Sequence, residues 1–124
     1  QAKSVYIASF TSQSGYELMK TAITELGDQL PHAFFVASDA LAVGALRALQ
    51  EAQIPVPSRV QLISFNGTTI TKQVYPSLSS ISVFTEEMGI QAVDLIDQMR
   101  QTHRPFHPRM IKLGTELTIR ESSL

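Results

Sequence analysis

The stretch Ala33–Asn66 constrains the fold most, because it predicts a strand, a helix and a second strand in succession. Ala33–Ala37 (AFFVA) is a short apolar run of the kind found in strands buried on both faces. Val60–Phe65 is a second such run, and Pro55 and Pro57 prevent the helix before it from continuing. A right-handed crossover makes the two strands parallel. The stretch therefore predicts a βαβ unit, which meets ligands at the carboxyl ends of its strands.

The helix of this unit begins at a polar pair, Ser38 and Asp39, whose side-chain oxygens can accept hydrogen bonds from the first turn. Its apolar residues fall on one face, and Arg47 and Gln50 fall elsewhere. The predicted core face consists of Leu41, Ala42, Ala45, Leu46 and Leu49.

The other elements follow from local patterns. Ser14 and Glu17 have the spacing of a capping box, which predicts that a helix starts at Ser14 and ends at Gly27. We expect strands over Ser4–Ser9, Ser79–Phe84, Met110–Leu113 and Leu117–Arg120, a short helix or turn over Thr71–Tyr75, a helix over Glu86–Arg100, and a loop over His103–Pro108.

Composition narrows the class of protein. The chain has 124 residues, 44% hydrophobic and 17% charged, which is ordinary for one soluble domain. A net charge of −1 provides no general attraction for nucleic acid, and no apolar run is long enough to predict a membrane span. The absence of cysteine fits a reducing cytoplasm.

No motif for catalysis is present in the sequence. We find no nucleophile elbow, no zinc-protease motif and no glycine-rich phosphate loop. His103 and His107 have a metal-binding spacing, but Pro105 between them argues against the helix that such a site needs. We therefore expect no catalytic residue, no metal site and no cofactor.

Several further motifs occur in a characteristic order. They are SDALAVGALRALQEAQIPVPSRVQLISFN, YPSLSSI, MGIQAVDLI and the closing ELTIRESS. Together they resemble the effector-binding core of the LacI/GalR family of bacterial transcriptional repressors. The resemblance implies an α/β fold, part of a doubly wound and mostly parallel sheet flanked by helices, of the type I periplasmic-binding-protein-like kind.

The resemblance also implies a division of the chain. Residues 1–82 and 114–124 correspond to the C-terminal lobe of the effector-binding domain, in incomplete form. Residues 83–113 correspond to a crossover and a helix that belong to the N-terminal lobe, and the helix-turn-helix headpiece is absent. The apolar stripe of that helix then lacks its partner sheet, so we expect self-association or a domain-swapped dimer. The stripe consists of Met88, Ala92, Leu95, Ile96 and Met99.

The resemblance places candidate effector contacts at the strand ends. Phe10 stands where the family often has an aromatic residue that packs on a sugar or purine, although a plain core role explains it equally well. Ser38 is the favoured polar contact. For Asp39, capping of the helix is favoured over a ligand contact.

Asn66 stands where many family members carry Asp, which can accept hydrogen bonds from two sugar hydroxyls. An amide both donates and accepts, so sugar binding survives the change, whereas Asn66 and Gly67 could instead simply form a turn. Val83 stands at the lobe crossover, where some members have a polar sugar contact that valine cannot make. The motifs FN and PSLSSISVFTEEMG resemble those of some repressors of galactose and galactoside operons in the family, and this resemblance implies galactose or a galactoside as effector.

Four residues match family surfaces for dimerisation: Val43, Leu46, Val74 and Tyr75. Core packing explains Leu46 equally well.

The implied function is effector sensing and homodimerisation in a cytoplasmic bacterial repressor that binds operator DNA through the missing headpiece. The alternative is a periplasmic sugar-binding protein of a transport system, which shares the same architecture.

Overall fold

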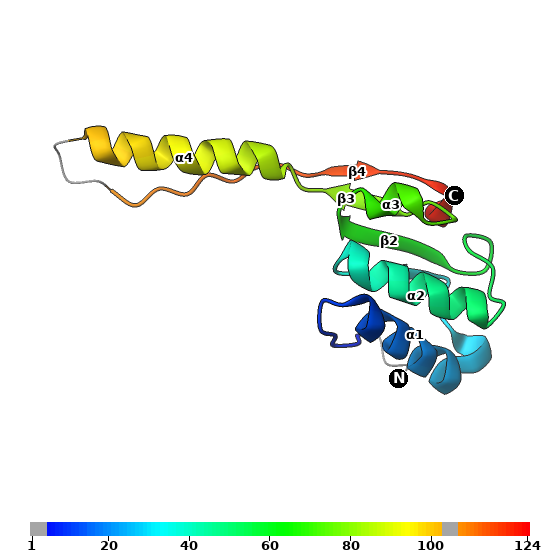
Figure 1. The fold of residues 1–124 in the computed structure, drawn as a ribbon. Coiled ribbons are helices and arrows are strands. Elements are labelled where there is room, and N and C mark those ends of the chain that lie inside the picture. The colour runs from blue at the N-terminus through cyan, green and yellow to red at the C-terminus, as the bar shows by residue number, and fades with distance from the viewer. Residues whose placement is uncertain (1–4, 103–106) are drawn as a thin grey trace.

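The computed structural model describes residues 5–102 and 107–124 and shows one mixed sheet (Figure 1). The strand order is β1 (Ala33–Phe35), β2 (Gln61–Asn66), β3 (Ser79–Ser82) and β4 (Glu116–Thr118). β1, β2 and β3 run parallel, and β4 is antiparallel to β3. The predicted fold class, a mostly parallel sheet flanked by helices, is confirmed.

The predicted βαβ unit is present. Helix α2 (Asp39–Glu51) connects β1 to the parallel strand β2. Its N-cap is Ser38, whose hydroxyl accepts a hydrogen bond from the N–H of Leu41 at 3.3 Å. All five residues of the predicted core face are buried, while Arg47 and Gln50 are exposed. The 3.6-residue period of the sequence therefore identified the buried side of this helix.

Helix α1 (Ser12–Leu26) starts earlier than its predicted capping box. Its N-cap is Thr11, whose hydroxyl accepts from the N–H of Ser14 at 3.1 Å. The hydroxyl of Ser14 in turn accepts from the N–H of Ser9. Thr11 and Ser14 therefore cap the start of the helix, in place of the expected pair Ser14 and Glu17. The predicted end at Gly27 is confirmed, because Gly27 is the C-cap.

The core lies between α1, α2 and the sheet, with α2 between α1 and β2 (Figure 1). α1 and α2 meet at two glycines. A Cβ on Gly15 would lie 2.1 Å from the carbonyl oxygen of Leu41, and one on Gly44 would lie 1.8 Å from that of Ser12. The two backbones can approach this closely only because neither glycine has a side chain. The buried apolar side chains of the core are Met19, Ala22, Leu30, Ala42, Ala45, Leu46, Ala48, Leu49, Val60, Leu62 and Leu78.

The remaining elements are short, and two predicted strands are wrong. The structure has η1 (Gly27–Gln29), α3 (Ile70–Gln73) and η2 (Glu121–Ser123). Residues 5–9 and 110–113 form no strand, because neither segment finds a neighbouring strand with which to share ladder hydrogen bonds. Of the predicted loop His103–Pro108, residues 103–106 lie outside the described part.

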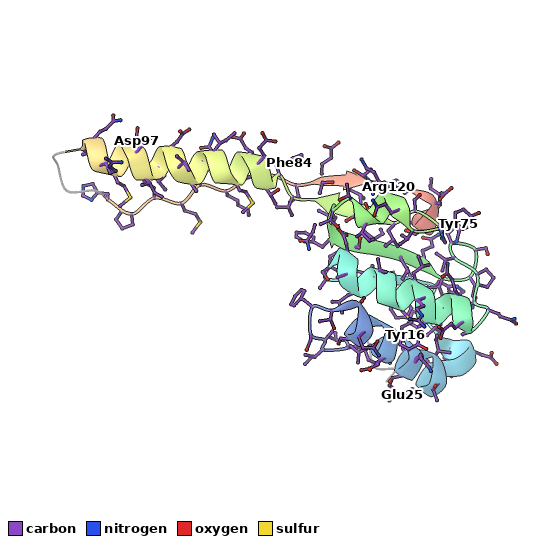
Figure 2. All side chains as sticks on the ribbon, in the orientation of Figure 1. Tyr16, Glu25, Tyr75, Phe84, Asp97 and Arg120 are labelled. Atoms are coloured by element: carbon purple, nitrogen blue, oxygen red, sulfur yellow. The ribbon has the colours of Figure 1, made fainter. Side chains whose placement is uncertain are left out.

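Helix α4 (Thr85–Gln101) projects away from the sheet, and the chain returns beside it to β4 (Figure 1). Arg109 on the returning segment donates to the side chain of Gln98 at 2.9 Å. Side chains stand out along α4 in Figure 2, and no residue of α4 is fully buried. Apolar side chains of the predicted stripe, including Met88, Ile96 and Met99, are about half exposed.

Within residues 5–102 and 107–124, no helix is both long and apolar enough to cross a bilayer.

Candidate functional site: a cavity at the carboxyl ends of the strands

A cavity of about 500 Å³ opens where β2 ends and α2 begins. It combines an aromatic ring, aliphatic side chains, hydroxyls and an amide. Its lining residues are Phe10, Ser12, Ser38, Asp39, Ala40, Val43, Asn66, Thr68 and Ile70. This position, beyond the carboxyl ends of parallel strands, is where open α/β sheets bind ligands.

Asp39 forms the buried base of this cavity and is only 2% exposed. One carboxylate oxygen, Oδ1, accepts from the hydroxyls of Ser64 at 2.5 Å and Ser80 at 2.8 Å. The other, Oδ2, accepts from the N–H of Thr68 at 2.6 Å and its hydroxyl at 2.7 Å. A carboxylate has about four acceptor positions, so these four bonds leave it little capacity for a ligand.

The same contacts set the ionisation of Asp39. Burial by itself would raise the pKa of its carboxyl, because the charged form loses water. The hydrogen bonds from Ser64, Thr68 and Ser80 oppose burial, and their sum lowers the pKa below its ordinary value. Asp39 is therefore a stable, permanently charged anchor at neutral pH and is unsuited to act as a proton donor or acceptor.

Asn66 ends β2 with a φ of 114°, in the region that favours glycine. Its carbonyl oxygen accepts from the N–H of Val83 at 3.1 Å. Gly67 follows with a φ of 72°, and a Cβ there would lie 2.5 Å from the hydroxyl oxygen of Ser82. The backbone needs glycine at this position, and the resulting turn places Asn66 among the residues that line the cavity.

Four of the five predicted effector residues come together in the cavity: Phe10, Ser38, Asp39 and Asn66. The Phe10 side chain is 70% exposed and so is not a core residue. Val83 is not among the lining residues. It lies just after β3, where its backbone is joined to Asn66.

The predicted dimer residues occupy different environments. Leu46 is 3% exposed and belongs to the core, whereas Tyr75 is 80% exposed and lies at the edge of the molecule near α3 (Figure 2). Val43 and Val74 are half buried against the core, and Val43 also lines the cavity. Tyr75 therefore offers the most accessible side chain of the four.

The buried serines that hold Asp39 were not anticipated from the sequence. Ser64 lies in the middle of β2 between apolar neighbours, and Ser80 lies in β3. A small hydroxyl residue inside a buried strand needs a hydrogen-bond partner, and that requirement was the available signal. Thr68 was also missed, because nothing in the sequence shows that the loop after β2 folds back onto α2.

Comparison with known proteins places this geometry in a family. The family model of the periplasmic binding protein-like domain matches residues 2–123. The chain is 53% identical, over 96% of its length, to the HTH-type transcriptional regulator GalR of Streptococcus thermophilus. It is 41% identical, over 98% of its length, to the HTH-type transcriptional repressor MelR of Bacillus subtilis (strain 168). It spans about a third of the length of these relatives, 35% and 34% respectively.

Solved structures agree with the sequence comparison. A complex of the transcriptional regulator CelR with cellobiose superimposes with a TM-score of 0.83 at 30% identity, over 94% of this chain and 35% of that one. The lac repressor dimer bound to operator and an anti-inducer has the same fold, with a TM-score of 0.83 at 24% identity, over 94% of this chain and 40% of that one. The chain therefore belongs to the periplasmic binding protein-like domain family and is a segment of an effector-binding domain of the LacI/GalR type.

Proposed function

We propose that this segment senses a small-molecule effector and supports homodimerisation in a bacterial LacI/GalR-type repressor. The single observation that carries the proposal is that Phe10, Ser38 and Asn66, from three separate parts of the chain, line one cavity. The similarity to GalR and MelR, both named as HTH-type regulators, favours a regulator over a periplasmic transport protein.

A sugar fits the chemistry of the cavity. The exposed ring of Phe10 can pack on the C–H groups of a sugar ring, and the Asn66 amide can both donate to and accept from its hydroxyls. That a related regulator was solved with cellobiose supports this ligand class. Among sugars we propose galactose or a galactoside, because the motifs around Asn66 and β3 resemble those of repressors of galactose and galactoside operons.

The proposed mechanism is allosteric. Residues 1–82 and 114–124 form part of one lobe, and residues 83–113 belong to the other. Effector bound between the lobes favours one relative orientation. In a homodimer, this orientation changes how two helix-turn-helix headpieces, carried by the rest of the protein, meet two operator half-sites in the cytoplasm. The segment itself performs the sensing step and reads no DNA.

Dimerisation is assigned to the surface around Tyr75. This side chain is largely exposed and aromatic, and residues of this kind are enriched at protein interfaces. Val74 precedes it in the chain and is half buried. Val43, which also lines the cavity, and the buried Leu46 complete the proposed set.

Isothermal titration of the complete regulator with galactose, lactose, glucose and adenine tests the ligand assignment. We expect saturable binding of one sugar in the wild type and a loss of affinity of at least about tenfold in Asn66→Ala, which removes both hydrogen-bonding groups of the amide. Gln29→Ala is the matched control, because it removes an exposed amide on η1, away from the cavity-lining residues.

Equal affinity in the wild type and Asn66→Ala would overturn the assignment of the cavity. Binding of adenine alone would overturn the assignment of a sugar as ligand but would keep the assignment of the cavity as the binding site. Absence of heat from all four compounds, with the protein shown to be folded, would remove the sugar assignment and leave the family membership as a statement about the fold.

A further inference from the structure

Ser80 lies behind the cavity and contacts the turn that carries Asn66. It is 0% exposed and is not among the lining residues, so it has no access to a ligand. Its hydroxyl donates to Oδ1 of Asp39 at 2.8 Å and accepts from the N–H of Gly67 at 3.1 Å. One hydroxyl therefore joins the start of α2 to the residue directly after Asn66.

Asp39 holds the same turn one residue further on. Its Oδ2 accepts from both the N–H and the hydroxyl of Thr68, while its Oδ1 is shared by Ser80 and Ser64. Together, Ser80 and Asp39 fix Gly67 and Thr68 against α2 and β3.

Asn66 itself is fixed only through its backbone. Its carbonyl oxygen accepts from the N–H of Val83, but its side-chain amide has no hydrogen-bond partner among the described residues. Its φ of 114° is unfavourable for a residue with a side chain and persists only where the surroundings impose it. The amide is thus held at the cavity edge by contacts of its neighbours, with its own donors and acceptor open.

We propose that Ser80 and Asp39 are positioning residues for Asn66: their shared hydrogen bonds hold the turn 66–68 in the one conformation that presents the Asn66 amide to an effector. This inference rests on the proposed function, and it adds two residues that set affinity without meeting the ligand. Asp39 reaches this role through the charge that its buried hydrogen bonds maintain.

The first test compares two neighbouring serines of β3 in the complete regulator. Ser80→Ala removes the bonds to Asp39 and Gly67. Ser79→Ala is the matched control, since Ser79 is equally buried, but its hydroxyl faces Arg120 and Ser123 near the C-terminal end. Titration uses galactose, or whichever of the other three compounds binds. We expect roughly tenfold weaker binding in Ser80→Ala and unchanged affinity in Ser79→Ala, with both variants losing thermal stability.

The second test is a double-mutant cycle with Asn66→Ala. If Ser80 acts through Asn66, the double variant binds no more weakly than Asn66→Ala alone. A simple loss of stability predicts instead that the two effects add. Additive losses, or equal loss of affinity in Ser79→Ala and Ser80→Ala, would overturn the proposal.

A third test, with a pair of variants at Thr68, covers the case in which Ser80→Ala does not fold. Thr68 is more exposed than Ser80 and lies at the cavity lining, and its hydroxyl is one of the four donors to Asp39. Thr68→Val removes the hydroxyl and keeps the shape, whereas Thr68→Ser keeps the hydroxyl. Affinity that falls in Thr68→Val and is restored in Thr68→Ser supports the role of the network, and the reverse order contradicts it.

A readout without ligand separates this inference from the proposed function. Hydrogen exchange at the amide of Gly67 reports its bond to Ser80 directly. We expect protection in the wild type and in Ser79→Ala, and faster exchange in Ser80→Ala. If no compound binds the wild type but this pattern holds, the proposed ligand is wrong and the positioning of the turn stands. Unprotected Gly67 in the wild type would overturn the positioning itself.

Discussion

Buried polar residues behind the cavity hold together the segments that line it. The carboxylate of Asp39 is only 2% exposed, and its burial is tolerated because every acceptor position is used. Its partners come from β2, β3 and the loop between β2 and α3, so one side chain ties together three segments. Removing a single partner would leave charge or a donor buried and unsatisfied, which costs about 1–3 kcal/mol.

The ionisation of Asp39 predicts how stability depends on pH. Because its pKa is lowered in the folded state, the ionised carboxylate stabilises the native protein above the unfolded pKa, and this contribution is lost as pH falls through the lowered folded value. The free energy of unfolding in urea, measured for the wild type and Asp39→Asn, should differ by a constant amount from about pH 7 to 5. The difference should begin to shrink below roughly pH 4 and go on shrinking as pH falls through the lowered folded pKa. A difference that stays constant into strong acid would show that the charge of Asp39 is not what stabilises the fold.

At the scale of residues, the sequence predicted several residues that line the cavity and missed those that hold them. Ser38 and Asn66 are recognisable because they stand beside a helix start and at a strand end, whereas Phe10 was proposed from the family resemblance. Ser64 and Ser80 look like ordinary strand residues until the third dimension brings Asp39 between them. Long-range hydrogen bonds leave almost no trace in a local pattern.

At the scale of elements, the close crossing of α1 and α2 determines where both helices lie. Gly15 of α1 meets the backbone of α2 at Leu41, and Gly44 of α2 meets the backbone of α1 at Ser12. These reciprocal contacts place the first turns of both helices together beside the cavity, which Ser12, Ser38 and Ala40 all help to line.

A substitution at this crossing should be costly. In Gly44→Ala the added methyl group meets backbone atoms that cannot move separately, so we expect a loss of about 1–3 kcal/mol in the free energy of unfolding. Gly89→Ala in α4 is the control: no atom lies within 4 Å of the place that its methyl group would occupy, and alanine should gain about 0.5–1 kcal/mol there. Thermal and urea denaturation measure both, and equal effects at the two sites would contradict the packing argument.

The elements themselves were predictable where periodicity is local. The βαβ unit followed from two apolar runs and one amphipathic face. The start of α1 was not decided locally, because Thr11 with Ser14 and Ser14 with Glu17 both have capping spacing, and packing of Ser12 on Gly44 favours the earlier start. Residues 110–113 have strand composition but no strand beside them, and a ladder partner is a property of the whole fold.

The whole molecule has two unequal parts: a sheet with its helices, and α4 with the segment that runs back beside it (Figure 1). The stability of an amphipathic helix comes mainly from packing of its apolar face. Here that face includes the half-exposed side chains of Met88, Ile96 and Met99. The other lobe is the cover proposed for it in the complete protein.

The 124-residue chain by itself should therefore self-associate. We expect sedimentation velocity at micromolar concentration to show species larger than a monomer, with a proportion that rises with concentration. Ile96→Glu with Met99→Glu should shift the chain toward monomer, because charges do not pack in an apolar interface.

The control for that experiment is Thr24→Glu with Gln29→Glu, which adds the same charge at exposed positions outside α4. Association that persists unchanged in the α4 variant would assign it to another surface. The surface around Phe35 of β1, which is 64% exposed, is the one to examine in that event.

The pairing of β3 with β4 also has a mechanical consequence. The chain leaves the sheet after Ser82 and re-enters it at Glu116, and these two residues are register partners in one antiparallel ladder. A single connection would let α4 swivel about the chain axis. Two connections locked side by side remove that freedom and leave bending about a line that crosses both strands. The paired connections therefore act as a hinge, and they confine the movement of α4 and the returning segment to rotation about one axis.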